Sequence, residues 1–265
     1  MAKQEQNESP PNYEEAVMTP PRYGSLPSTM NVHGQWTKWK SLNLCGASAK
    51  DRLCLIEMQT GYSGKPPLGM RTGFLLRNGM STKNPLLAAA GDESQGLHAF
   101  NPDGIIFCHH LIQTPKVMRA EPGTNNDIAF HFSIEIGEKQ QRQEFAWRRA
   151  KKGDDGVKKN GFKLVLLSSG QQASRPSASS SIQKPASSLP SSRGKDGENV
   201  AFLEWAMAFP SMTHAFTLEL VDGQSEMLGA RWTLMVVVTA IRLYTLHVKG
   251  KTSKFVVNMG KKDSK

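Results

Sequence analysis

Strict alternation of apolar and polar residues marks one segment of the chain as a strand. Between positions 128 and 136, every second residue is apolar and His131, Ser133 and Glu135 stand between them; the apolar set is Ile128, Phe130, Phe132, Ile134 and Ile136. A period of two predicts a half-buried β-strand. Phe162–Leu167 is a second predicted strand, and short apolar runs broken by Gly and Pro recur at 53–56, 73–76 and 105–108.

The helical signals are short. Residues 85–90 after Asn84 fit a short helix, and 199–209 has helical spacing that places Phe202, Trp205 and Phe209 on one face before Pro210. These elements, set among the strands, predict an α+β fold with a strand-dominated core and a few short helices.

The end of the chain is read as a hairpin. Two predicted strands, 214–220 and 231–248, flank a loop that contains Asp222-Gly223, and 255–257 fits a short edge strand. The most apolar stretch, Trp232 to Val248, is short for a membrane span and contains Arg242 and His247. It is therefore predicted to be a buried strand rather than a transmembrane helix.

Composition divides the 265 residues into four sections. Residues 1–30 are a polar, proline-rich tail and 168–198 form a Ser/Pro-rich run, neither of which carries enough apolar residues to repay ordering. Residues 31–167 form a globular section, and 199–265 are predicted to be the C-terminal part of the core with a basic end. Each low-complexity section is expected to be disordered, the first as a tail and the second as a linker or long loop.

Charge and cysteine content narrow the setting. The formal net charge of +10 suggests an acidic partner, either nucleic acid or an anionic lipid surface. Three cysteines, an odd and sparse set, argue against a disulfide framework and for a reducing compartment. The polar N-terminus contains no signal peptide.

The tail carries two Pro-Pro-x-Tyr cassettes. The six residues that define them are Pro10, Pro11, Tyr13, Pro20, Pro21 and Tyr23. Proline preorganises such a peptide in the polyproline II conformation, and a WW domain binds the proline pair and the tyrosine in adjacent pockets. The cassettes therefore predict recruitment of WW-domain partners, of which HECT-type ubiquitin ligases are the expected class.

Two clusters of basic residues are the candidate contacts with membrane or nucleic acid. The first contains Arg148, Arg149, Lys151, Lys152, Lys158, Lys159 and Lys163, and the second contains Lys249, Lys251, Lys254, Lys261, Lys262 and Lys265. Each Lys or Arg near an anionic membrane contributes about 1 kcal/mol. Neither cluster has interleaved aromatic residues for base stacking, which weakens a single-strand nucleic-acid role. The first also has the spacing of a bipartite nuclear-import signal.

No catalytic constellation is evident. The chain lacks GxSxG, Walker A, HExxH and paired CxxC motifs. Cys108-His109-His110 is a poor metal site, because adjacent side chains on a strand point to opposite faces. We therefore expect no enzyme activity, no cofactor and no metal.

A small basic chain with an N-terminal PPxY tail resembles the matrix proteins of enveloped negative-strand RNA viruses, of rhabdovirus or filovirus type. The resemblance rests on Pro10, Pro11, Tyr13, Pro20, Pro21 and Tyr23, where that family has its late-budding motif. It implies a structural protein of the virion that lines the inner face of the envelope and the host membrane, self-associates, contacts the nucleocapsid and recruits ubiquitin ligases for budding.

Two other classes remain open. PPxY tails also occur in retroviral Gag proteins and in cellular ligase adaptors, but adaptors usually carry a recognisable cargo fold or a transmembrane span, and neither is visible in the sequence. A basic nucleic-acid-binding protein would use the same charge. Such a protein would also be compatible with a transient nuclear presence.

Overall fold

The structure is a computed structural model that describes residues 26–34, 40–62, 64, 66–93, 102–108, 115–122, 128–137, 140–153, 159–167, 197–206, 213–253 and 257. Both Pro-Pro-x-Tyr cassettes, residues 168–196 of the Ser/Pro-rich run, and Lys158, Lys261 and Lys262 lie outside these residues.

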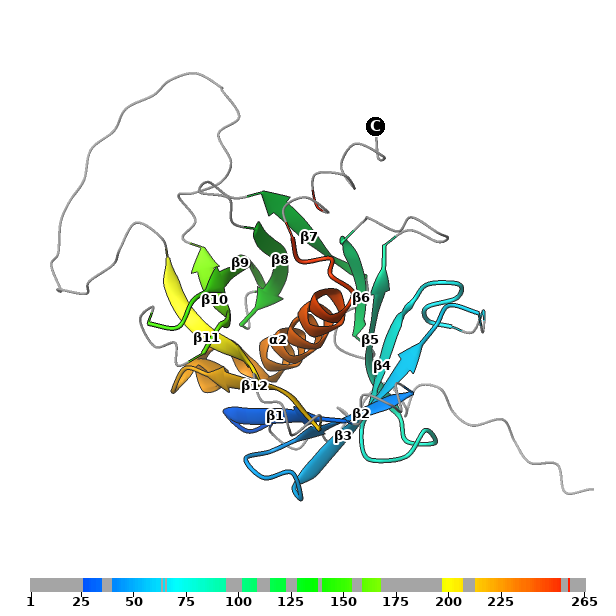
Figure 1. The fold of residues 1–265 in the computed structure, drawn as a ribbon. Coiled ribbons are helices and arrows are strands. Elements are labelled where there is room, and N and C mark those ends of the chain that lie inside the picture. The colour runs from blue at the N-terminus through cyan, green and yellow to red at the C-terminus, as the bar shows by residue number, and fades with distance from the viewer. Residues whose placement is uncertain are drawn as a thin grey trace, which may run out of the picture.

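Twelve antiparallel strands form a closed barrel around one helix, α2 (Figure 1). Each strand pairs with its neighbours in sequence, and pairing of β1 with β12 closes the ring. The strands are β1 (Thr29–His33), β2 (Ser41–Cys45), β3 (Arg52–Gln59), β4 (Gly73–Arg77), β5 (Leu86–Asp92), β6 (Gly104–Cys108), β7 (Lys116–Pro122), β8 (Ile128–Ile136), β9 (Gln141–Ala150), β10 (Gly161–Leu167), β11 (Glu198–Trp205) and β12 (His214–Leu220), and the helix is α2 (Gln224–Val248).

The barrel corrects the α+β prediction. The core is dominated by strands as expected, but the short helices of that prediction are mostly strand in the residues that the structure describes. Residues 86–90, predicted to be helical, lie in β5, and 199–205 lie in β11. In β11 the residues Val200, Leu203 and Trp205 are buried on the inner side of a wall, where the extended backbone is paired on both edges. Pairing with neighbouring strands determines the conformation of these segments, and the spacing of apolar residues within one segment does not reveal that pairing.

The predicted hairpin at the end of the chain is half wrong. Residues 214–220 form β12 as predicted, whereas 231–248 belong to α2 instead of a strand. Of the predicted edge strand 255–257, only Val257 is described, and it is buried in the core. The β-branched run Val236-Val237-Val238-Thr239 favours a strand by propensity, and tertiary burial overrides that preference.

The helix is buried because it is apolar on every side. From Trp232 to Leu246 nearly every side chain is buried against the inner wall, and a helix without a polar face requires such enclosure. By length and hydropathy α2 is also a candidate membrane span, yet most of it is covered by the barrel. One of its buried polar contacts with the wall is the bond from the Trp147 indole N–H to Thr239 Oγ1 at 2.9 Å.

Glycines define where the helix bends and ends. Gly229 interrupts α2 with φ 83°, a conformation that favours glycine. At the far end Gly250 has φ 69°, its N–H donates to the His247 carbonyl, and the Lys251 N–H donates to the Leu246 carbonyl. This pair of bonds is the Schellman motif, so α2 stops at a defined residue.

The up-and-down order of the strands gives the barrel two distinct ends. We call the end where α2 finishes, β9 ends and β10 begins the basic end. We call the other, where β1, β11 and α2 begin, the tail end. The part of the helix after Gly229, residues 230–248, is about 28 Å long.

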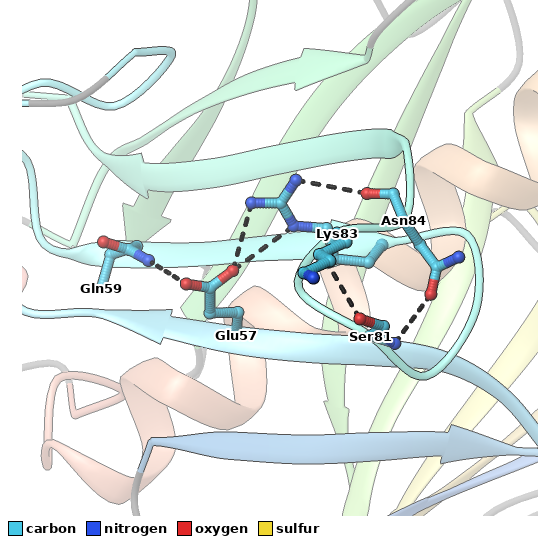
Figure 2. Close-up of polar contacts among 6 residues, drawn as sticks. Glu57, Gln59, Ser81, Lys83 and Asn84 are labelled. Atoms are coloured by element: carbon cyan, nitrogen blue, oxygen red, sulfur yellow. Dashed lines mark hydrogen bonds and ion pairs between the residues drawn. The ribbon is translucent and has the colours of Figure 1, made fainter.

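Turns at the tail end are held by short polar networks. In the β4–β5 turn, Asn84 Oδ1 accepts from the Ser81 N–H at 2.7 Å and the Lys83 N–H donates to Ser81 Oγ at 3.2 Å (Figure 2). Arg77 links this turn to Glu57 on β3 through a 3.2 Å ion pair. The turn therefore presents Lys83 from a fixed backbone.

Candidate basic docking face

The first basic cluster lies where β9 passes into β10. Arg148 and Arg149 are in β9, and their backbones are paired with β8 or β10. Arg149, Lys151, Lys152 and Lys159 are exposed, whereas Arg148 is half-buried. Because Arg148 and Arg149 belong to a barrel strand, an importin could take them up as an extended peptide only if the barrel opened.

The second basic cluster meets the first at the same end of the barrel. Arg149 Nη2 donates to the carbonyl of Thr252 at 3.2 Å, a contact between residues 103 positions apart. Lys249 and Lys251 flank Gly250 immediately before Thr252. Two segments that are remote in sequence thus contribute to one basic face, which contains Arg149, Lys151, Lys152, Lys159, Lys249 and Lys251 among the described residues.

A ring stack fixes the end of α2 against the barrel wall on this side. The His247 imidazole lies parallel to the Trp205 indole, with ring centroids 4.5 Å apart and 8° between the planes. Burial lowers the pKa of His247, and the nearby Arg149 charge lowers it further. At neutral pH this contact is therefore the stacking of two neutral rings.

A buried arginine stands beneath the basic face. Arg242 is fully buried on α2, and its Nη2 donates to Asp92 Oδ1 at 2.6 Å and to the Asp103 carbonyl at 3.3 Å. Gly104 passes so close that an added Cβ would lie 3.0 Å from Arg242 Nε. Glycine at this position therefore leaves the space that the guanidinium needs.

Asp92 balances three cations. Burial on its own raises the pKa of Asp92, but the charge and hydrogen bond of Arg242, together with Lys249 and Lys251, hold it below its ordinary value. Burial lowers the pKa of Lys249 and of Lys251; the Asp92 charge opposes this effect and Arg242 adds to it. The helix end thus carries more positive than negative charge.

Two further carboxylates described at the basic end share one arginine. Arg119 lies 3.2 Å from Glu93 and 3.3 Å from Asp103. Arg119 offsets only one of these two negative charges, so the three groups together leave one negative charge beside the six cations of the face. The face therefore presents an excess of positive charge toward any surface that contacts this end.

The tail leaves from the opposite end. Leu26, the first described residue, packs against the core, and the Ser28 carbonyl accepts from the Leu220 N–H at 2.7 Å, where β12 finishes. Gly197, near the end of the Ser/Pro-rich section, lies beside the Leu166 carbonyl at the same end. Both low-complexity sections are thus joined to the barrel at the end remote from the basic face.

Sequence reasoning missed the Asp92–Arg242 pair and the convergence of the two clusters. In the sequence Arg242 is only a charge inside an apolar stretch, and a partner 150 positions away carries no local signal. Within the described ranges, no group of three or more His, Cys, Asp or Glu side chains is arranged to hold a metal ion.

Comparisons with known proteins identify no relative: no family model, curated protein or solved structure matches the chain.

Proposed function

We propose that the protein is a structural adaptor that docks on anionic membrane through its basic face and recruits WW-domain ubiquitin ligases through its N-terminal cassettes. The observation that carries this proposal is the separation of the two ends. The basic residues gather where α2 finishes, whereas the chain that bears the cassettes joins the barrel where α2 begins.

The basic face supplies the membrane half of the proposal. At about 1 kcal/mol for each Lys or Arg near an anionic surface, the exposed side chains of Arg149, Lys151, Lys152 and Lys159 contribute a few kcal/mol together. Such attraction decays over about 8 Å at physiological ionic strength. Binding should therefore weaken steeply as salt is added.

The cassettes supply the ligase half. The connection from Tyr23 to Leu26 extends at most about 11 Å, so the second cassette stays near the tail end. A WW domain bound there would sit on the side of the barrel that faces away from the membrane. This placement lets the protein contact both partners at once.

The proposed function has two versions, which differ in whether the protein is viral or cellular. In the first, the resemblance of the tail motif setting to viral matrix proteins extends to the whole protein, which then coats a budding membrane, associates with further copies and contacts a nucleocapsid. In the second, the chain is a cellular adaptor. Both versions use the same basic face and the same cassettes, so they are distinguished by particle release rather than by the barrel itself.

Vesicle flotation tests the membrane half. Lys151→Glu, Lys152→Glu and Lys159→Glu together should abolish binding to phosphatidylserine vesicles at physiological salt. The matched control is Lys50→Glu, Lys83→Glu and Arg142→Glu, the same charge change on exposed residues of the tail end, and it should retain most of the binding. Equal losses in both variants would contradict docking through the basic face.

Binding to isolated WW domains tests the ligase half. Tyr13→Ala with Tyr23→Ala should abolish it and leave vesicle flotation unchanged, while either change alone should weaken it partially. Unchanged affinity of the double variant would exclude the cassettes as the binding site. Expression of the protein alone then separates the two versions, since only a matrix protein should release particles that contain it.

A further inference from the structure

The connection between β3 and β4 covers residues 60–72, all described except 63 and 65, and it presents two large side chains to solvent. Leu68 is 2% exposed and packs with Leu75 and Ala89 on the outer side of the barrel wall. Arg71 adds a backbone bond to the Leu68 carbonyl at 3.1 Å. The loop is therefore anchored to the barrel by one buried leucine.

Two large side chains of the same loop are not buried. Tyr62 is 88% exposed and Met70 is 54% exposed. The backbone on both sides of Tyr62 lies close to Met70, because a Cβ at Gly61 would come within 2.7 Å of the Met70 carbonyl oxygen and one at Gly64 within 3.9 Å of Met70 Sδ. One loop thus offers an exposed tyrosine and an exposed methionine to a partner surface.

The loop adjoins the basic face. Arg71 Nε donates to the Glu93 carbonyl at 3.2 Å, and the Asp92 N–H donates to the Thr72 carbonyl at 2.9 Å. Asp92 in turn holds Arg242 and lies within the electrostatic reach of Lys249 and Lys251. The loop sequence itself contains Lys65 and Arg71 and no acidic residue.

We propose that Tyr62 and Met70 form an apolar anchor that enters the headgroup region of an anionic lipid bilayer, beside the basic face. The proposal rests on membrane docking as proposed above and adds a second, salt-resistant component to it. Positive charge around the loop selects an anionic surface, and tyrosine is suited to the membrane interface because it has an apolar ring and a polar hydroxyl.

An environment-sensitive NBD label on the full chain tests the anchor. The label is placed at Tyr62→Cys and, as the matched control, at Met227→Cys, a 63% exposed position at the tail end. The three native cysteines are buried, so labelling should be specific to the introduced thiol. On adding phosphatidylserine vesicles, the label at position 62 should shift to the blue and be quenched by nitroxide lipids, while the label at 227 should not respond.

The outcomes separate the anchor from docking itself. Flotation of the labelled protein without any response at position 62 would overturn the anchor and leave the basic face intact, whereas failure to float would overturn both. A blue shift that grows with protein concentration in the absence of vesicles would assign the loop to a second copy of the chain instead.

A second variant measures the contribution of the anchor. Tyr62→Ser with Met70→Ser should lower vesicle partitioning about tenfold or more at a salt concentration that screens the basic face, since each side chain loses apolar burial in the bilayer. Met227→Ser is the control and should change nothing. Both variants should melt as the parent protein does, because the altered side chains are exposed.

Discussion

The buried ion pair between Arg242 and Asp92 gives the sharpest prediction about stability. Arg242 is fully buried, and two of its nitrogens, Nε and Nη1, have no hydrogen-bond partner. Its Nη2 depends on Asp92 at 2.6 Å and more weakly on the Asp103 carbonyl at 3.3 Å. Replacing Asp92 by Ala would leave a guanidinium in the barrel with one neutral acceptor.

Removing one member of a buried pair costs about 3–5 kcal/mol, because the remaining charge stays desolvated. In a domain of this size each kcal/mol lowers the melting temperature by about 2–4 °C. Asp92→Ala should therefore melt roughly 6–20 °C below the parent protein. Lys249 and Lys251 should act in the same direction, since Asp92 is also their nearby countercharge.

Thermal and urea denaturation with a double-mutant cycle are the assay. Arg242→Met should relieve much of the damage caused by Asp92→Ala, so the double variant should be more stable than additivity predicts by about 2 kcal/mol or more. Glu93→Ala is the matched control, since it breaks an ion pair with the largely exposed Arg119 and should cost about 1 kcal/mol or less. If Asp92→Ala and Glu93→Ala cost the same, or if the cycle is additive, the reasoning about the buried charge is wrong.

Three further predictions concern pH, thiols and packing. Burial lowers the pKa of His33 and of His214, and the charge of His214 lowers that of His33 further. The free energy of unfolding should therefore be constant above about pH 6.5 and fall below it, because the unfolded chain then binds more protons. Unfolding curves from pH 8 to 3 should show this loss and a second one below about pH 4, where Asp92 is protonated and its contribution disappears. Burial raises the pKa of Cys54 to about 11 and of Cys108 to about 12, so thiol reagents should react far more slowly with the native than with the unfolded protein, and rapid native reaction would contradict their burial. Thr239→Val removes the acceptor of the buried Trp147 indole and should destabilise the protein by about 1–3 kcal/mol in urea unfolding, while a smaller effect would mean that another acceptor takes its place.

Local periodicity predicted the strands whose two faces differ. In β8 the residues Ile128, Phe130, Phe132 and Ile134 are buried, while the alternate positions are partly exposed, as the period of two requires. The prediction for Phe162–Leu167 was likewise confirmed by β10. The β8 segment faces the core on one side and solvent on the other, so its environment is visible in its own sequence.

The central helix could not be predicted in this way, because its environment is apolar on every side. A segment surrounded by a barrel has no polar face, and periodicity cannot distinguish a buried helix from a buried strand. The length of the run and the flanking signals were the better indicators. Asp222-Gly223 precedes the helix, and Gly250 between two lysines is a typical helix stop with favourable charge for the C-terminal dipole.

The basic face depends on the same architecture. Each cluster was visible in the sequence as a run of lysines and arginines, but their union depends on strand order, because β9 must end beside the point where α2 finishes. The positions of Asp92 and of the loop around Tyr62 follow from that order as well. The sequence therefore identifies the charges, while the closed barrel makes them one surface and places the start of the tail at the other end.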